Sequence, residues 1–310
     1  MSFLDQRSNE MPGSNNKATV ILKLNSIAKI ILIIASIILF ATRSWTGEDA
    51  FIFFRYVDNL VNGNGLVFNF GERVEGFTSP LWIFVLSLIR LITNFDLRPT
   101  AIILGIILST ISITLLLFFD NSKKVFFPLG IILLMANSAF RDFATSGFET
   151  SLIYLLITAF AILIKKSLIY ERPFLAGLIL SLLILARPET LLLIPYALIL
   201  LVTEKKKYIK TDESKPRSKF KQIILFFVPI MLIVGGYQIF RMGYYASFFP
   251  NTYYAKKGGE IYMAQGMHYL SDFIKSYKIS FSIILIIIIG TFRFDKGFYT
   301  VPHKLDHLVR

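Results

Sequence analysis

The sequence has 310 residues, of which 55% are hydrophobic, whereas a soluble domain is usually about 45–50% apolar. It contains no cysteine, which excludes disulfides, thiolate metal sites and cysteine nucleophiles within this chain. The net charge of +13 does not indicate a nucleic-acid partner, because basic residues gather in the cytoplasmic loops of membrane proteins. The composition therefore predicts an all-α polytopic membrane protein.

Nine apolar segments follow the polar N-terminus, and most are long enough to cross a bilayer. They cover residues 27–44, 80–94, 99–119, 125–138, 150–164, 173–186, 188–203, 222–243 and 277–292. The lysines before residue 30 place the N-terminus in the cytoplasm, but nine crossings would then put the basic loop 204–221 outside. Segment 80–94 is short and contains Arg90, so we expect it to be an amphipathic helix at the outer surface. The prediction is then about eight transmembrane helices.

This topology divides the chain into three parts. Residues 1–26 form a cytoplasmic N-terminal tail, 27–292 a transmembrane domain, and 293–310 a cytoplasmic C-terminal tail. The first extracytoplasmic loop spans residues 45–98. Every polar cluster that is not a plain lysine run then lies on the outer side. Such clustering of distant segments indicates one shared site.

The first outer loop opens with two adjacent carboxylates, Glu48 and Asp49, directly after an apolar segment. A charged pair at a membrane boundary is costly unless it is paired or used. Residues 49–62 have the apolar spacing of an amphipathic helix, which Asp49 can cap and the following glycines end. Residues 66–77 flank a turn, which predicts a small hairpin.

Several motifs, in this loop and further along the chain, point to a known family. They are Glu48-Asp49-Ala50-Phe51-Ile52 with Arg55-Tyr56, then Gly65-Leu66-Val67-Phe68-Asn69, then Gly71 to Thr78, followed by Gly147-Phe148-Glu149-Thr150, Arg187-Pro188-Glu189 and Pro250 to Lys256. In this order they resemble GT-C membrane glycosyltransferases, above all the actinobacterial terminal arabinofuranosyltransferases. The resemblance covers roughly residues 25–260 and implies a GT-C-like helical bundle.

The resemblance also implies an activity. Such enzymes transfer a sugar from a polyprenyl-phosphate-linked donor to a cell-envelope glycan or lipid acceptor, with inversion, at the extracytoplasmic face of the bacterial inner membrane. Family members usually continue with more helices, so a truncated, non-catalytic homologue is one alternative. A transporter or flippase of lipid-linked sugars is the other, although transporters tend to place charges in the middle of the membrane.

Sugar transfer needs a base for the acceptor hydroxyl and groups that hold the leaving phosphate. The family's catalytic aspartate falls at Asp49, and Glu48 is a second base or a sugar or metal contact. Arg55 either pairs with Asp49 or binds phosphate. The other candidate substrate or phosphate contacts are Arg73, Glu75, Glu149, Arg187, Glu189, Asn251, Tyr253 and Lys256.

Each of these candidates has a plain structural alternative. Arg73 can simply pair with Glu75, and Arg187 with Glu189. Glu149 suits the start of a helix, where the dipole favours a carboxylate. For the segment 251–256, contact with membrane lipids at the interface is as simple an explanation as substrate binding.

Cofactors are not indicated. His303 and His307 have metal-ligand spacing, but no further ligand type is assured in the predicted cytoplasmic tail, so no metal site is predicted and a divalent cation stays an open option. The sequence has no glycine-rich nucleotide loop, which favours a lipid-linked donor over a nucleotide sugar.

Overall fold

The computed structural model describes residues 12–119, 128–165, 168–203, 218–256 and 262–276. These residues form helices and loops with no strand among them, which confirms the predicted all-α class. The chain divides into two compact units, residues 1–256 and 257–310. Within the second unit the structure describes α14 (Met263–Ser276).

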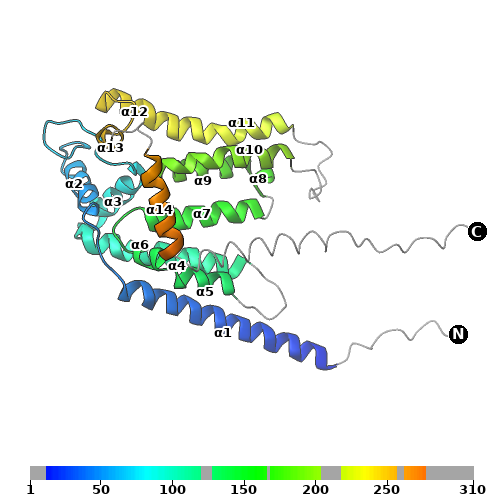
Figure 1. The fold of residues 1–310 in the computed structure, drawn as a ribbon. Helices are drawn as coiled ribbons and strands as arrows, with labels where there is room; N and C mark the ends of the chain where they lie inside the picture. Colours follow the sequence, from blue (N-terminus) through cyan, green and yellow to red (C-terminus); the bar gives the residue numbers. More distant parts are fainter. Residues whose placement is uncertain (1–11, 120–127, 166–167, 204–217, 257–261, 277–310) are drawn as a thin grey trace, which may run out of the picture. The chain divides into compact units, whose positions relative to one another are not determined.

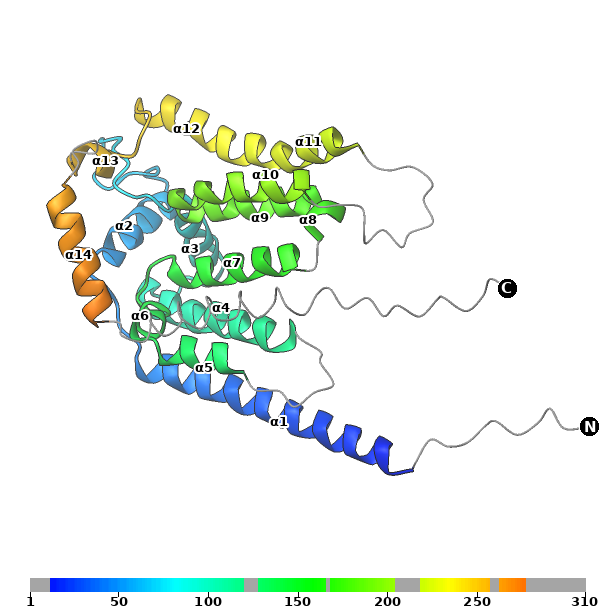
Figure 2. The ribbon, with the colours of Figure 1, turned by 45° about the vertical axis from the view of Figure 1, so that its right-hand side comes forward.

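Several helices of the first unit lie side by side in a row, and α2, α3 and α13 lie beside one end of this row (Figure 1). A turned view shows the same arrangement (Figure 2). The row contains α1 (Pro12–Thr42), α4 (Leu97–Phe119), α7 (Thr150–Lys165), α9 (Pro173–Ala186), α10 (Leu193–Thr203) and the continuous run of α11 (Lys219–Pro229), the π-helix η2 (Ile230–Gly235) and α12 (Gly236–Tyr245). The first unit also contains α2 (Ala50–Val61), α3 (Pro80–Thr93), α5 (Leu129–Ala136), α6 (Ser138–Phe143), α8 (Leu168–Glu171), the 3₁₀-helix η1 (Pro188–Leu192) and α13 (Asn251–Ala255).

Three helical stretches of the described chain are long and apolar enough to cross a membrane. They are Leu22–Thr42, Leu97–Phe119 and Lys219–Tyr245. Four shorter apolar helices accompany them, Pro80–Thr93 among these. The membrane class is thus supported, while the number of eight crossings stays a prediction and segment 277–292 lies outside the described residues. Helix α1 begins at Pro12, inside the predicted N-terminal tail.

Close packing between α9 and α11 rests on a glycine. A Cβ added at Gly177 would overlap the carbonyl oxygen of Phe226, so the two backbones touch at a point where no side chain intervenes. Small residues commonly permit such contacts between membrane helices, because apolar side chains gain little by leaving lipid. The contact brings α11, and with it α12, against the centre of the helical unit.

The first outer loop folds as predicted at the end of its first helix but not at residues 66–77. Helix α2 ends at Val61, and Gly63 follows with a φ of 78°, so the glycine does end the helix. The predicted hairpin at residues 66–77 is wrong, because this segment contains no strand. The Asn59 side chain donates to the carbonyls of Val67 (2.8 Å) and Phe68 (2.9 Å). Because a side chain of α2 already donates hydrogen bonds to these carbonyls, they do not require a partner strand.

Helix α3 packs on α2. Its inner face buries Trp82 and Leu86 completely. Arg90, the charge that argued against a crossing, lies 3.5 Å from Asp58 of α2. The two helices of the first loop therefore form one compact layer, joined by apolar packing and an ion pair.

Candidate active site

Glu48 and Asp49 lie in the exposed turn between α1 and α2. The Gly47 N–H donates to the Ser146 carbonyl (2.9 Å), which holds this turn against the loop before α7. Asp49 is the N-cap residue directly before α2, yet its side chain makes no capping hydrogen bond. The expected capping role is therefore wrong, and the carboxylate of Asp49 faces solvent without a structural task in the helix.

The predicted pairing of Arg55 with Asp49 is also wrong. Arg55 Nε donates to the Phe68 carbonyl (3.2 Å), and the guanidinium lies over the Phe70 ring, 5.6 Å from its centroid. Residues six apart on a helix point in different directions, whereas three or four apart would have met. Arg55 is exposed, so its second predicted role, phosphate binding, stays a prediction.

Glu149 and Arg187 form the central ion pair of the site. Arg187 Nη1 donates to Glu149 Oε1 (2.7 Å), joining the residue before α7 to the residue after α9. Glu149 is buried, while half of the Arg187 side chain is exposed. The expected partner Glu189 is also present, 3.3 Å from Arg187 Nε. Burial alone would lower the pKa of Arg187, but the bond and charge of Glu149, with Glu189, hold that pKa above its usual value.

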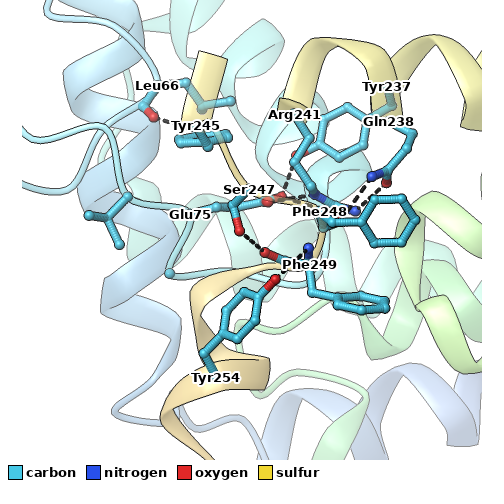
Figure 3. Close-up of polar contacts among 12 residues, drawn as sticks. Leu66, Glu75, Tyr237, Gln238, Arg241, Tyr245, Ser247, Phe248, Phe249 and Tyr254 are labelled. Atoms are coloured by element: carbon cyan, nitrogen blue, oxygen red, sulfur yellow. Dashed lines mark hydrogen bonds and ion pairs between the residues drawn. The ribbon is translucent and has the colours of Figure 1, made fainter. Parts of the chain in front are cut away.

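Glu75 is buried and pairs with a residue that the sequence analysis missed. Arg241 Nε donates to Glu75 Oε2 (2.6 Å), and Arg241 Nη2 donates to Oε1 (3.2 Å). Tyr237 Oη donates to the same Oε1 (2.7 Å), as Figure 3 shows. The expected Arg73–Glu75 pair is wrong, because Arg73 stays exposed over the Tyr244 ring, 4.8 Å from its centroid. A buried carboxylate needs a buried partner, and α12 supplies it.

A signal for Arg241 was present in the sequence. It is a cation within the apolar segment 222–243, where a charge is expensive unless it is paired. Its partner lies 166 positions earlier, and no local pattern identifies a residue at that separation.

The remaining candidates lie on α13 and beside it. The Asn251 N–H donates to the Glu75 carbonyl (2.8 Å), so α13 begins directly on the first outer loop. Asn251, Tyr253 and Lys256 are exposed, the last as the residue that ends α13. Their side chains are thus accessible, and their roles in substrate binding stay predictions.

Further hydrogen bonds bring the ends of other helices to the same place. Trp45 Nε1, after α1, donates to the Asp142 carbonyl of α6 (2.5 Å). Tyr245 Oη, at the end of α12, donates to the Leu66 carbonyl of the first loop (2.7 Å). With the Glu149 and Asn251 contacts, these bonds place the polar clusters of the sequence analysis at one end of the helical unit.

Comparisons with known proteins identify two related sequences. The chain is 31% identical over 279 residues to a terminal beta-(1->2)-arabinofuranosyltransferase of Corynebacterium glutamicum, with 80% of this chain and 38% of the relative covered. It is 30% identical over 266 residues to a terminal beta-(1->2)-arabinofuranosyltransferase of Mycobacterium tuberculosis, with 80% and 40% covered. No family model matches the chain. No solved structure matches it either.

The resemblance inferred from the motifs is thereby confirmed: the chain is related to the arabinofuranosyltransferase-like group of GT-C membrane glycosyltransferases. It spans about two fifths of the length of these relatives. The similarity extends over most of this chain.

Proposed function

We propose that this chain carries the catalytic face of a membrane glycosyltransferase. It transfers a sugar from a polyprenyl-phosphate-linked donor to a cell-envelope glycan or lipid acceptor, at the extracytoplasmic face of the bacterial inner membrane. The names of the relatives suggest an arabinofuranosyl group as the sugar. The observation that carries the proposal is the exposed Asp49 carboxylate, which has no capping bond and lies in a turn held against the loop that leads to Glu149.

In the proposed reaction Asp49 removes the proton from the acceptor hydroxyl as its oxygen attacks the anomeric carbon. The bond from that carbon to the donor phosphate breaks on the opposite face, which inverts the configuration. The leaving phosphate keeps the electron pair and needs cationic groups nearby. Arg187 is suited to this role. Its guanidinium is half-exposed and has further N–H donors besides those that contact Glu149 and Glu189. Arg55, Arg73 and Lys256 are exposed cations at the same end.

Glu48 has a supporting role in this proposal, as an exposed neighbour that contacts the sugar or a divalent cation. Glu75 is different. Its carboxylate is enclosed by Arg241 and Tyr237, so we propose a structural task for it in place of direct substrate binding.

The test is a transfer assay with labelled polyprenyl-phosphate arabinofuranose and a short arabinan acceptor. Asp49→Asn should lower the rate by about a hundredfold or more, since a positioned base typically contributes that much. The matched control is Asp96→Asn, another exposed carboxylate, before α4 at the same end of the unit. Transfer by Asp49→Asn at the wild-type rate would overturn the assignment. Movement of the intact donor across a vesicle, without product, would favour a transporter.

A further inference from the structure

We propose that Arg241 is a positioning residue that fixes α13 against the first outer loop, so that the exposed groups of α13 are held ready for a phosphate-bearing lipid. This inference rests on the proposed function, because it assigns the segment 251–256 to donor binding. It concerns a residue that touches neither the reacting atoms nor the substrate.

First, the Arg241 guanidinium binds neighbouring side chains through all three of its nitrogens. Its guanidinium uses two nitrogens on Glu75 of the first loop (2.6 and 3.2 Å). A third nitrogen, Nη1, donates to Gln238 Oε1 (2.8 Å) one turn earlier on α12. Only 11% of the Arg241 side chain and 1% of that of Glu75 are exposed. A bidentate pair at this depth fixes direction as well as distance.

The second step is the path from this pair to α13. Gln238 Nε2 donates to the Phe248 carbonyl (2.9 Å), which lies in the segment that joins α12 to α13. The Asn251 N–H, at the first residue of α13, donates to the Glu75 carbonyl (2.8 Å). Arg241 therefore contacts both residues that hold this segment, as Figure 3 shows for Glu75 and Gln238.

The third step is the turn between the two helices. Ala246 has a φ of 52°, so the chain reverses at the end of α12 in the left-handed region that residues with a Cβ seldom adopt. Strain of this kind persists only where the surroundings determine the backbone. The bonds to Phe248 and Asn251 are the surroundings that do so.

The consequence concerns the exposed side of α13. Tyr253 and Tyr254 are 41% and 51% exposed, and Lys256 follows at the end of the helix. A helix of five residues has little stability of its own, so its position depends on these anchors. Anchoring removes the entropic cost of ordering the segment when a ligand binds.

The experiment compares variants of the full chain in detergent. Since the chain has no native cysteine, spin labels can be placed at Glu72→Cys of the first loop and Ala255→Cys of α13. Arg241→Met should broaden the distance distribution between these labels. A second pair, Glu72→Cys and Phe95→Cys, reports on the first loop alone and should keep its wild-type distribution.

Binding of polyprenyl monophosphate, which needs no turnover, provides the second readout. Arg241→Met should weaken it roughly three- to tenfold. Gln238→Leu breaks the link to Phe248 while leaving the ion pair intact, so it should give a smaller loss in a chain that still folds. Arg241→Lys keeps the charge but not the fork and should restore part of the affinity.

The matched control is Arg90→Met, which removes the ion pair between α3 and α2 without touching α13. Unchanged label distances or unchanged binding in Arg241→Met would overturn the inference, as would an equal loss of affinity in Arg90→Met. The proposed function is tested separately: it is overturned if Asp49→Asn transfers the sugar at the wild-type rate.

Discussion

The Arg187 guanidinium and the Glu149 carboxylate meet at 2.7 Å, although 38 positions separate them in the chain. The contact joins the end of α9 to the start of α7 and leaves one side of Arg187 open to solvent. Glu149 is nearly inaccessible, with 2% of its surface exposed. The pair is therefore asymmetric: the carboxylate holds the arginine, and the arginine presents its remaining donors outward.

This asymmetry predicts that loss of Arg187 destabilises the folded chain through the buried charge of Glu149. Arg187→Met leaves the buried Glu149 charge uncompensated and should lower the free energy of unfolding by about 3–5 kcal/mol. The double variant Arg187→Met/Glu149→Gln should be more stable than Arg187→Met alone, because no buried charge remains. Thermal unfolding in detergent measures both. A double variant that is less stable than either single variant would contradict this account of the pair.

Gly147 is predicted to be important for activity because it lies against the start of α2. Its φ is 83°, and an added Cβ would come within 2.9 Å of the Ala50 Cβ and 3.2 Å of Thr46 Cγ2. Gly147→Ala should therefore push on the turn that carries Asp49, in addition to backbone strain of about 1–3 kcal/mol. We expect transfer to fall at least tenfold.

The chain offers a matched control for this substitution. Gly63 has a similar φ of 78°, yet nothing lies within 4 Å of an added Cβ. Gly63→Ala should introduce the same kind of strain without moving α2, so stability should fall while the transfer rate per folded molecule is kept. Equal rates for the two variants in the transfer assay would refute the positional role of Gly147.

Some local features of this site follow from the sequence, although the Asp49 cap and the hairpin at residues 66–77 do not form. The end of α2 follows from a glycine, and the contact of Arg187 with Glu189 follows from their closeness in the chain. Periodicity and turn residues are local properties, so a single sequence contains them. The gathering of polar clusters at one end was also expected, because alternating apolar segments return the chain repeatedly to the same side.

The specific partners could not be predicted from the sequence. Glu149 meets Arg187, and Glu75 meets Arg241, only because α7, α9 and α12 pack at particular rotations. Apolar periodicity does not fix these rotations, and a glycine contact such as that of Gly177 contributes to them. Two pairings that the sequence analysis left as alternatives, Arg73–Glu75 and Asp49–Arg55, were wrong. Closeness in the sequence favoured these pairs, whereas the burial of the side chains determines which pairs form.

The contact at Gly177 predicts a strong effect on helix packing. A Cβ there would overlap the Phe226 carbonyl oxygen and approach the Pro229 ring to 2.9 Å. Gly177→Ala should separate α9 from α11 and lower the free energy of unfolding by about 1–3 kcal/mol. Gly243→Ala on α12 meets no atom within 4 Å and should be neutral or stabilising by up to about 1 kcal/mol. A neutral Gly177→Ala in thermal unfolding would contradict the packing described here.

The surroundings of Tyr56 predict how the free energy of unfolding changes with pH in the alkaline range. Its hydroxyl donates to the Val74 carbonyl (2.6 Å) and accepts from the Gly76 N–H (2.8 Å). Burial raises the pKa of this phenol above its usual value of 10.0, the Gly76 bond lowers that pKa by less, and the charge of Glu75 raises it further. The folded chain therefore keeps this proton at pH values where the unfolded chain has lost it.

The direction of the pH effect follows from that difference. The contribution of Tyr56 is fully present below about pH 10 and is lost as the pH rises through the raised pKa of the folded state. Tyr56→Phe should cost about 1–3 kcal/mol at neutral pH, because the Gly76 N–H loses its acceptor. The difference between wild type and variant should then shrink above pH 10. Tyr253→Phe, at an exposed phenol, should not alter the alkaline slope, and a difference for Tyr56→Phe that grew with pH would show that the phenol is not held protonated by the fold.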